Sequence, residues 1–143
     1  MEKSVNNLFV YGSLRSGFRN PAYEYITRYF NLVGEAVVRG RLYDAGESPV
    51  AVADTGDHFI TGELYELKDP SMFEWAFEQL DDYEGINPEA GTKPLYKRET
   101  ATIFREGEPV TSWIYWYNGD VKGMPVLEMG DVLKFLQEKN KPR

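Results

Sequence analysis

The feature that most constrains the fold is a run of short β-like segments, separated by turn residues, between residues 32 and 67. The segments are LVGEAVV, RLYDA, PVAVA and FITGELYEL. The segments contain β-branched or aromatic residues, and glycine, aspartate or proline stands between one segment and the next. This spacing is typical of a meander, in which short turns join antiparallel strands. We therefore expect this region to form a sheet rich in hairpins.

Helix and strand signals on either side of this region complete the expected order of elements. Leu8–Tyr11 is typical of a buried strand, and Pro21 then begins the helix PAYEYITRYF. After a central helix, the strands YKRETATIF and TSWIYWYN flank the tight turn REGEPV, which predicts a hairpin. A short helix capped by Asp131 follows, and residues 139–143 form a frayed tail. This order favours an α+β fold with partial barrel closure, in one domain over residues 1–143.

Composition and charge limit the classes of function. The chain has 143 residues and no cysteine, which suits a single core and excludes disulfides, thiolate nucleophiles and thiolate metal sites. A net charge of −7 argues against a nucleic-acid partner, because phosphate binding depends on clustered lysine and arginine. There is no signal segment and no apolar run of about 20 residues, so we expect a cytoplasmic protein without a membrane partner. The pattern does not define an oligomeric state.

The single histidine of the chain, His58, lies in the stretch ADTGDHF, which is typical of a turn between strands. Its neighbours Asp54 and Asp57 provide the nearest approach to a metal-binding set. One histidine without cysteine leaves only carboxylates for zinc, and no nucleophile-elbow pattern supports a serine triad. We therefore expect His58 to be a turn residue, and we expect no metal site.

The central helix, SMFEWAFEQLDDYEG, has two overlapping start signals and one acidic residue on its apolar face. It begins either with Asp69 as the cap or with Ser71 as the cap of a capping box. At about 100° per residue, its core face consists of Phe73, Ala76, Phe77 and Leu80. Around the helix axis, Glu84 lies about 20° from Phe73, whereas Asp82 lies about 180° from Phe73. Among the five acidic residues of this helix we expect Glu84 alone to point inward, and Gly85 to end the helix.

An inward carboxylate at a helix end has two interpretations. Burial raises the pKa of a carboxyl toward the range of general acid/base catalysis, and the helix C-terminus disfavours its charge, so Glu84 is a candidate catalytic residue. Alternatively, the last turn frays and Glu84 reaches water, or Glu84 forms a structural ion pair with Lys97 or Arg98.

The stretch LFVYGSLRSG offers the other half of a possible site. A strand that stops at Tyr11 and turns through Gly12 and Ser13 exposes successive backbone N–H groups, which bind a carboxylate or an oxyanion. The alternative is a turn with no ligand. The spacing matches neither a P-loop nor a dinucleotide fingerprint, so nucleotide phosphates are a poor candidate.

Together the motifs FVYGSL and LDDYEG resemble the γ-glutamylcyclotransferase-like family, which includes γ-glutamylamine cyclotransferases and other AIG2-like proteins. The resemblance extends through TGELYEL, LYKRETATI, WIYWY and EMGDVL, and so covers nearly the whole chain. The chain departs from many relatives at Pro21, where they have histidine, and at Val132, where they have an aromatic residue. It also lacks a tyrosine that longer relatives carry near residues 123–126. These differences bear on the choice of substrate.

The resemblance implies a small mixed, mainly antiparallel β-barrel with flanking helices, and it implies a set of roles. Glu84 would be the general acid/base. Tyr11, Gly12, Ser13 and Leu14 would form the wall of the substrate cavity, Tyr96 would line it, and Arg15 and Asn20 are looser candidates. The implied enzyme, of the lyase or acyltransferase type, needs no cofactor and cyclises a γ-glutamyl amine or peptide to 5-oxoproline. The alternatives are a non-catalytic module that binds a small carboxylate, and a related ring-closing or acyl-transfer reaction.

Overall fold

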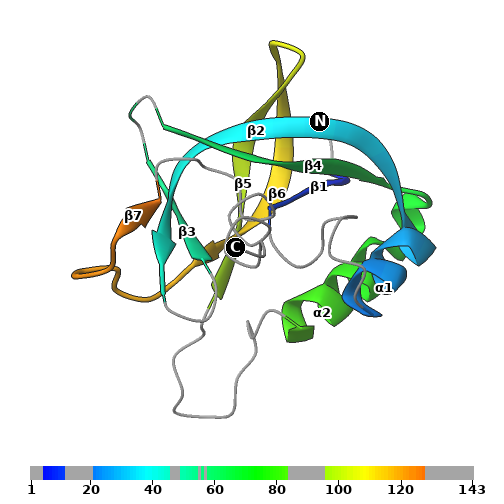
Figure 1. Ribbon diagram of the computed structural model, residues 1–143. Coiled ribbons are helices and arrows are strands. Elements are labelled where there is room, and N and C mark those ends of the chain that lie inside the picture. Colours follow the sequence, from blue (N-terminus) through cyan, green and yellow to red (C-terminus); the bar gives the residue numbers. More distant parts are fainter. Residues whose placement is uncertain are drawn as a thin grey trace, which may run out of the picture.

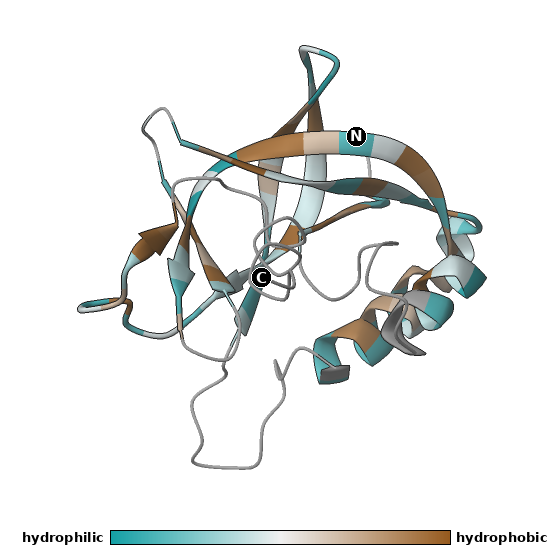
Figure 2. Ribbon diagram, viewed as in Figure 1, coloured by the Kyte–Doolittle hydropathy of each residue, from teal (hydrophilic) through white to brown (hydrophobic). Residues whose placement is uncertain are grey.

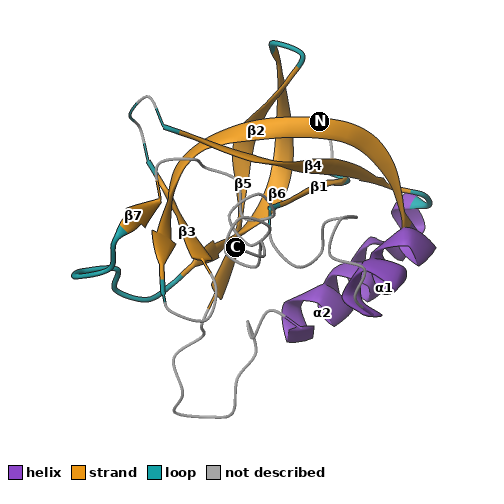
Figure 3. Ribbon diagram, viewed as in Figure 1, coloured by secondary structure: helices purple, strands orange, loops and turns teal. Residues whose placement is uncertain are grey.

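The computed structural model describes residues 5–11, 21–45, 49–54, 56, 58–83 and 96–127. Two helices lie side by side against one side of a curved β-sheet (Figure 1). The elements, in chain order, are β1 (Asn7–Val10), α1 (Pro21–Tyr29), β2 (Phe30–Asp44), β3 (Pro49–Ala53), β4 (Phe59–Leu67), the 3₁₀ turn η2 (Pro70–Met72), α2 (Phe73–Tyr83), β5 (Tyr96–Arg105), β6 (Glu108–Tyr117) and β7 (Val126–Leu127). Figure 3 shows how these helices and strands are distributed. The expected terminal helix after Gly130 lies outside the described residues.

Five strands close into a barrel, which confirms the expected α+β class. They are arranged in the order β2, β4, β1, β6 and β5, and β5 pairs again with β2 through Val37 opposite Phe104. Strand β1 runs parallel to β6, with Leu8 opposite Trp113, whereas the other pairings are antiparallel. Strands β3 and β7 extend the sheet along the far half of β2. The barrel is therefore mixed but mainly antiparallel.

The two faces of the barrel wall belong to two hydrophobic cores. Successive side chains of a strand point to opposite faces, and β1 shows this directly. Phe9 and Tyr11 lie in the barrel interior, whereas Leu8 and Val10 face the helices. The helices contribute Ile26 and the predicted core face of α2 to the second core, and Figure 2 shows hydrophobic and hydrophilic bands along both helices. The helices thus bury one part of the barrel's outer wall.

Strand β2 differs from the expectation of two separate segments. It is one strand of 15 residues, with a bulge between Leu32 and Gly34 where it pairs with β4. The glycine that separates LVGEAVV from RLYDA is Gly40, and it lies within the strand. A Cβ atom at Gly40 would stand 2.8 Å from Ile60 and 3.2 Å from Trp116, so this position is glycine because the packing is close and not because the chain turns.

Of the two predicted start signals for α2, the structure contains the first, with Asp69 as the cap. The carboxylate of Asp69 accepts hydrogen bonds from the backbone N–H and the hydroxyl of Ser71. Pro70 follows within the 3₁₀ turn, and the α-helix itself begins at Phe73. The remaining expected strands and the β5–β6 hairpin are confirmed, with β1 ending one residue earlier, at Val10.

Candidate active site

Tyr11 is the last described residue before the predicted binding loop, and its side chain enters the barrel. It is 9% exposed, and its ring stacks on Trp116 with the ring centroids 6.5 Å apart. Its hydroxyl donates a hydrogen bond to the backbone carbonyl of Tyr115. Because β1 runs parallel to β6 with Leu8 opposite Trp113, Tyr11 lies level with the end of β6. The chain therefore enters the loop from a fixed, buried position.

Asp81, near the end of α2, is held by two partners on the barrel wall. Arg98 of β5 donates to both of its carboxylate oxygens, at 2.8 Å from Nε and 3.2 Å from Nη2. The hydroxyl of Tyr115 donates to Oδ1 at 2.7 Å. The Asp81 residue is only 9% exposed. A buried charge of this kind needs both a cation and hydrogen bonds, and Asp81 has both.

This arrangement corrects the expectation that Glu84 alone among the acidic residues of α2 points inward. Asp81 stands about 80° from Phe73 on the helical wheel, at the border of the core face. Helical phase by itself leaves such a border residue undecided, and here Arg98 and Tyr115 draw its carboxylate inward. Asp82, one residue later, is exposed as expected.

Both cations that the sequence offered to Glu84 have other carboxylate partners in the described part of the chain. Arg98 pairs with Asp81, and the Lys97 ammonium lies 3.2 Å from Glu99. The Arg98 guanidinium also lies over the ring of Trp113, with 4.6 Å between Cζ and the ring centroid, and over Phe77 at 5.1 Å. Arg98 is therefore a structural cation at the junction of helix and barrel.

Tyr96 lies at the same end of the barrel as Tyr11 but on the other face of β6. It begins β5 opposite Tyr117, and the two rings meet edge to face with centroids 5.9 Å apart. Tyr117 shares its face of β6 with Tyr115, whereas Trp116 points into the interior beside Tyr11. The structure thus brings Tyr96 to the side of the Asp81 network.

Other predicted site residues lie outside the described residues, namely Gly12, Ser13, Leu14, Arg15, Asn20 and Glu84. His58 stands between β3 and β4 as expected, with Nδ1 3.9 Å from Asp54, whose carboxylate is bound by Arg41. Within the described ranges, no group of three or more histidine or acidic side chains is arranged to hold a metal ion. In that same part of the chain, no helix has the length and apolar character of a membrane span.

Comparison with known proteins identifies the family. Residues 8–134 match the sequence profile described as "Gamma-glutamyl cyclotransferase, AIG2-like". The chain belongs to this family. A γ-glutamyl cyclotransferase of Niallia circulans that acts on γ-L-glutamyl-butirosin B is 30% identical over 115 residues, which span 80% of this chain and 68% of that protein. The resemblance expected from FVYGSL and LDDYEG is therefore confirmed.

Solved structures of AIG2-like and other proteins share the fold. YkqA from Bacillus subtilis matches with a TM-score of 0.70 and 22% identity over 96% of this chain, which spans only 44% of that protein's length. An AIG2-like protein from Mus musculus matches with a TM-score of 0.61 and 24% identity, over 88% of each chain. The mixed barrel with two helices is thus a fold shared with the AIG2-like mouse protein.

Sequence reasoning missed the network of Asp81, Arg98 and Tyr115. The available signal was the pair of adjacent aspartates in LDDYEG, because one of two successive helical residues on a border necessarily lies nearer the core. Which cation would meet that residue depended on the pairing of β5 with β6, which sets Arg98 opposite Tyr115.

Proposed function

We propose that this chain is a γ-glutamyl cyclotransferase that converts a γ-glutamyl amine or γ-glutamyl peptide to 5-oxoproline and releases the amine. Glu84 is the general acid/base, and the backbone donors of Gly12, Ser13 and Leu14 bind the substrate. Family membership supports the reaction class, and the relative from Niallia circulans supports a γ-glutamyl amide as substrate. The proposed reaction needs no cofactor.

The observation that carries the proposal is the double role of Tyr115. Its carbonyl accepts from Tyr11, the residue before the loop, and its hydroxyl donates to Asp81, three residues before Glu84. Asp81 and Glu84 are separated by three residues of chain, which span at most about 11 Å. One residue of β6 therefore links Tyr11 and Asp81, described residues that precede in the chain the segments to which we assign binding and catalysis.

The reaction is an intramolecular aminolysis. The free α-amine of the glutamyl group attacks its own γ-carbonyl carbon, a C–N bond closes the five-membered ring, and the bond to the departing nitrogen breaks. Glu84 accepts the proton of the attacking amine and delivers it to the departing nitrogen, a transfer that contributes about 10²–10⁴ in rate. The protein's main task is to fold the substrate into the attacking geometry.

The loop supplies the second contribution. Successive backbone N–H groups after Tyr11 bind the substrate carboxylate or the oxyanion that develops on the γ-carbonyl, and one such donor contributes roughly 3 kcal/mol to transition-state stabilisation. We also assign Tyr11 and Tyr96 to the substrate site, and the two lie at the same end of the barrel on opposite faces of β6. Pro21 and Val132, where many relatives carry other residues, bear on which amine is released.

The test is to incubate the purified protein with γ-glutamyl amines, γ-glutamyl dipeptides and glutathione, and to measure 5-oxoproline by mass spectrometry. We expect release from at least one compound, and loss of at least about 100-fold in Glu84→Gln with an unchanged melting temperature. The matched control is Asp82→Asn, which makes the same chemical change at an exposed position of α2 and keeps full activity. Undiminished turnover by Glu84→Gln contradicts the mechanism.

The same panel separates the enzyme from the alternative on the same fold. A non-catalytic module that binds a small carboxylate would be stabilised against heat by these compounds but would release no 5-oxoproline. Adding a chelator gives a further check, because the proposed chemistry uses no metal ion and activity is expected to be unchanged.

A further inference from the structure

An open groove of about 590 Å³ lies on the outer face of the barrel, where β2 passes between β4 and β5. The described residues that line it are Glu35, Ala36, Val37, Arg39, Phe59, Phe104, Arg105, Glu106 and Gly107, and none of them belongs to a helix. This surface is separate from the Tyr11 and Asp81 region, whose residues do not line it.

The centre of the groove is apolar. Val37 of β2 has Phe104 of β5 directly opposite, and the rings of Phe59 and Phe104 meet edge to face with centroids 6.4 Å apart. Phe59 is 41% exposed, which makes it one of the few large hydrophobic side chains at the surface of the described structure. An exposed aromatic ring packed against a second, partly buried ring in one hollow indicates a contact surface.

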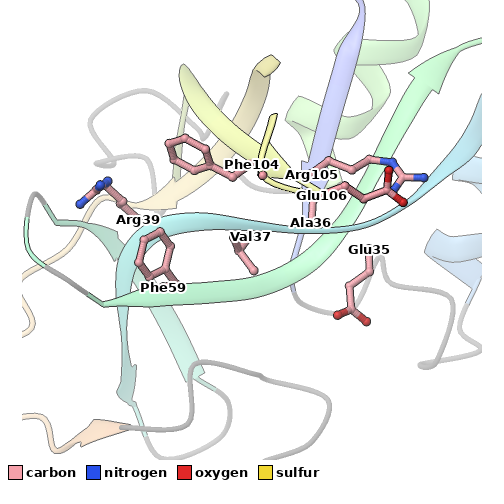
Figure 4. A pocket seen from close by; sticks show the side chains of 9 residues that line it. Glu35, Ala36, Val37, Arg39, Phe59, Phe104, Arg105 and Glu106 are labelled. Carbon is pink, nitrogen blue, oxygen red and sulfur yellow. The ribbon is translucent and has the colours of Figure 1, made fainter. Parts of the chain in front are cut away.

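Arg39 lies at one end of the groove and Glu35 at the other, where Arg105 and Glu106 also lie (Figure 4). The guanidinium carbon of Arg39 lies 5.3 Å from the ring centroid of Phe59. Glu35, at the other end, is exposed and makes no hydrogen bond or ion pair within the described residues. It stands directly opposite a second carboxylate, Glu63, an arrangement that is unfavourable without a cation nearby.

Arg105, which also lines the groove at this end, is already engaged. Arg105 donates to the carbonyl of Val33 at 3.1 Å, and its Nη1 lies 3.5 Å from Glu106. Glu35 therefore presents an exposed negative charge that has no cation partner in the described part of the chain.

Strand β2 presents these groups with a symmetric spacing. Glu35, Val37 and Arg39 are two residues apart, so they share the outer face, with Val37 at the centre. A two-fold axis through Val37 places a second β2 antiparallel to the first. Arg39 of each copy then meets Glu35 of the other, and the apolar centres meet each other. A surface with a positive end, an apolar centre and a negative end is self-complementary.

We infer that this groove is the interface of a homodimer, in which a second copy of this chain packs isologously across Val37. The two copies exchange two Arg39–Glu35 ion pairs and bury Phe59 and Phe104 between them. This interface leaves the Tyr11 end of the barrel free, so dimerisation and catalysis are separable.

The test is sedimentation velocity over a concentration series, from about 1 to 100 μM, with charge-reversed variants. We expect the wild type to dimerise, and Arg39→Glu and Glu35→Arg each to weaken dimerisation by about tenfold or more, because each places like charges face to face twice. Mixing the two variants restores both ion pairs in a heterodimer. Combining both substitutions in one chain restores them in a homodimer.

The matched controls are Arg28→Glu and Glu78→Arg, which make the same changes of charge at exposed helix positions and leave dimerisation unchanged. A wild type that stays monomeric throughout the series, including one that binds another molecule in this groove, overturns the inference. So do single variants that dimerise like the wild type, or a mixture that fails to recover. Circular dichroism spectra verify that every variant is folded.

Discussion

Asp81 of α2 and Arg98 of β5 form a bidentate ion pair, with N–O distances of 2.8 and 3.2 Å, at the junction between the helix layer and the barrel wall. Trp113 and Phe77 surround the guanidinium, and the hydroxyl of Tyr115 supplies a third donor to the carboxylate. The pair joins the end of the helix to the strands that carry Tyr96 and Tyr115, and it does so in a mostly buried setting.

Asp81→Asn is expected to lower the free energy of unfolding by about 3 kcal/mol, because it leaves the Arg98 guanidinium largely buried without its counter-charge. Urea unfolding measures the change. Asp82→Asn is the control, since this neighbouring aspartate is exposed, and it is expected to change the stability by less than about 0.5 kcal/mol. Equal effects of the two substitutions contradict the assigned role of Asp81.

Tyr115→Phe removes the hydroxyl donor to Asp81 and keeps both the ring and the backbone carbonyl that Tyr11 uses. We expect the free energy of unfolding to fall by about 1.5–3 kcal/mol, the effect of one hydrogen bond to a charged group. The same measurement on Tyr117→Phe serves as the control. Its hydroxyl makes no hydrogen bond to another described residue, so its removal is expected to be nearly neutral. A neutral Tyr115→Phe would falsify the network.

Tyr25 gives the fold a dependence on alkaline pH. Its hydroxyl donates to the carbonyl of Ala76 at 3.1 Å and so links α1 to α2, and burial, with a smaller effect of Tyr29, raises its pKa from 10.0 to about 12. The folded state therefore favours the neutral phenol. This contribution to stability is fully present below pH 10 and is lost as the pH rises from 10 toward 12.

The measurement is urea unfolding of the wild type and Tyr25→Phe at pH 8 and pH 11. The comparison cancels the titration of the other tyrosines, so the stability advantage of the wild type is expected to shrink at pH 11. An advantage that is the same at both values contradicts the raised pKa.

Gly62→Ala probes the closeness of β4 and β1. A Cβ atom at this position would collide with the backbone carbonyl of Val10 and come within 2.5 Å of the ring of Phe9. We expect a loss of about 1–3 kcal/mol in the free energy of unfolding, because neither the backbone nor the buried ring moves easily. At Gly56 an added Cβ meets nothing closer than 3.5 Å, so Gly56→Ala is the matched control and is expected to keep the wild-type melting temperature.

Local patterns predicted most of the elements of this fold. The apolar spacing of α2, one of the two cap signals at its start and the turn between β5 and β6 each depend on neighbours a few positions apart, and the structure confirms them. Gly40 shows where such reasoning fails. A glycine within a strand resembles a turn signal, although close packing against Ile60 and Trp116 is what accounts for it here.

The candidate site, too, could be predicted from the sequence only in part. The sequence by itself determined the family, through two motifs about seventy residues apart, and it predicted Glu84 and the loop after Tyr11, which remain predictions because they lie outside the described residues. Only the tertiary structure decided that Asp81 is buried and that Arg98 belongs to it. Helical phase left Asp81 on the border of a face, and its burial is favourable only because β5 and β6 bring a guanidinium and a phenol to that point.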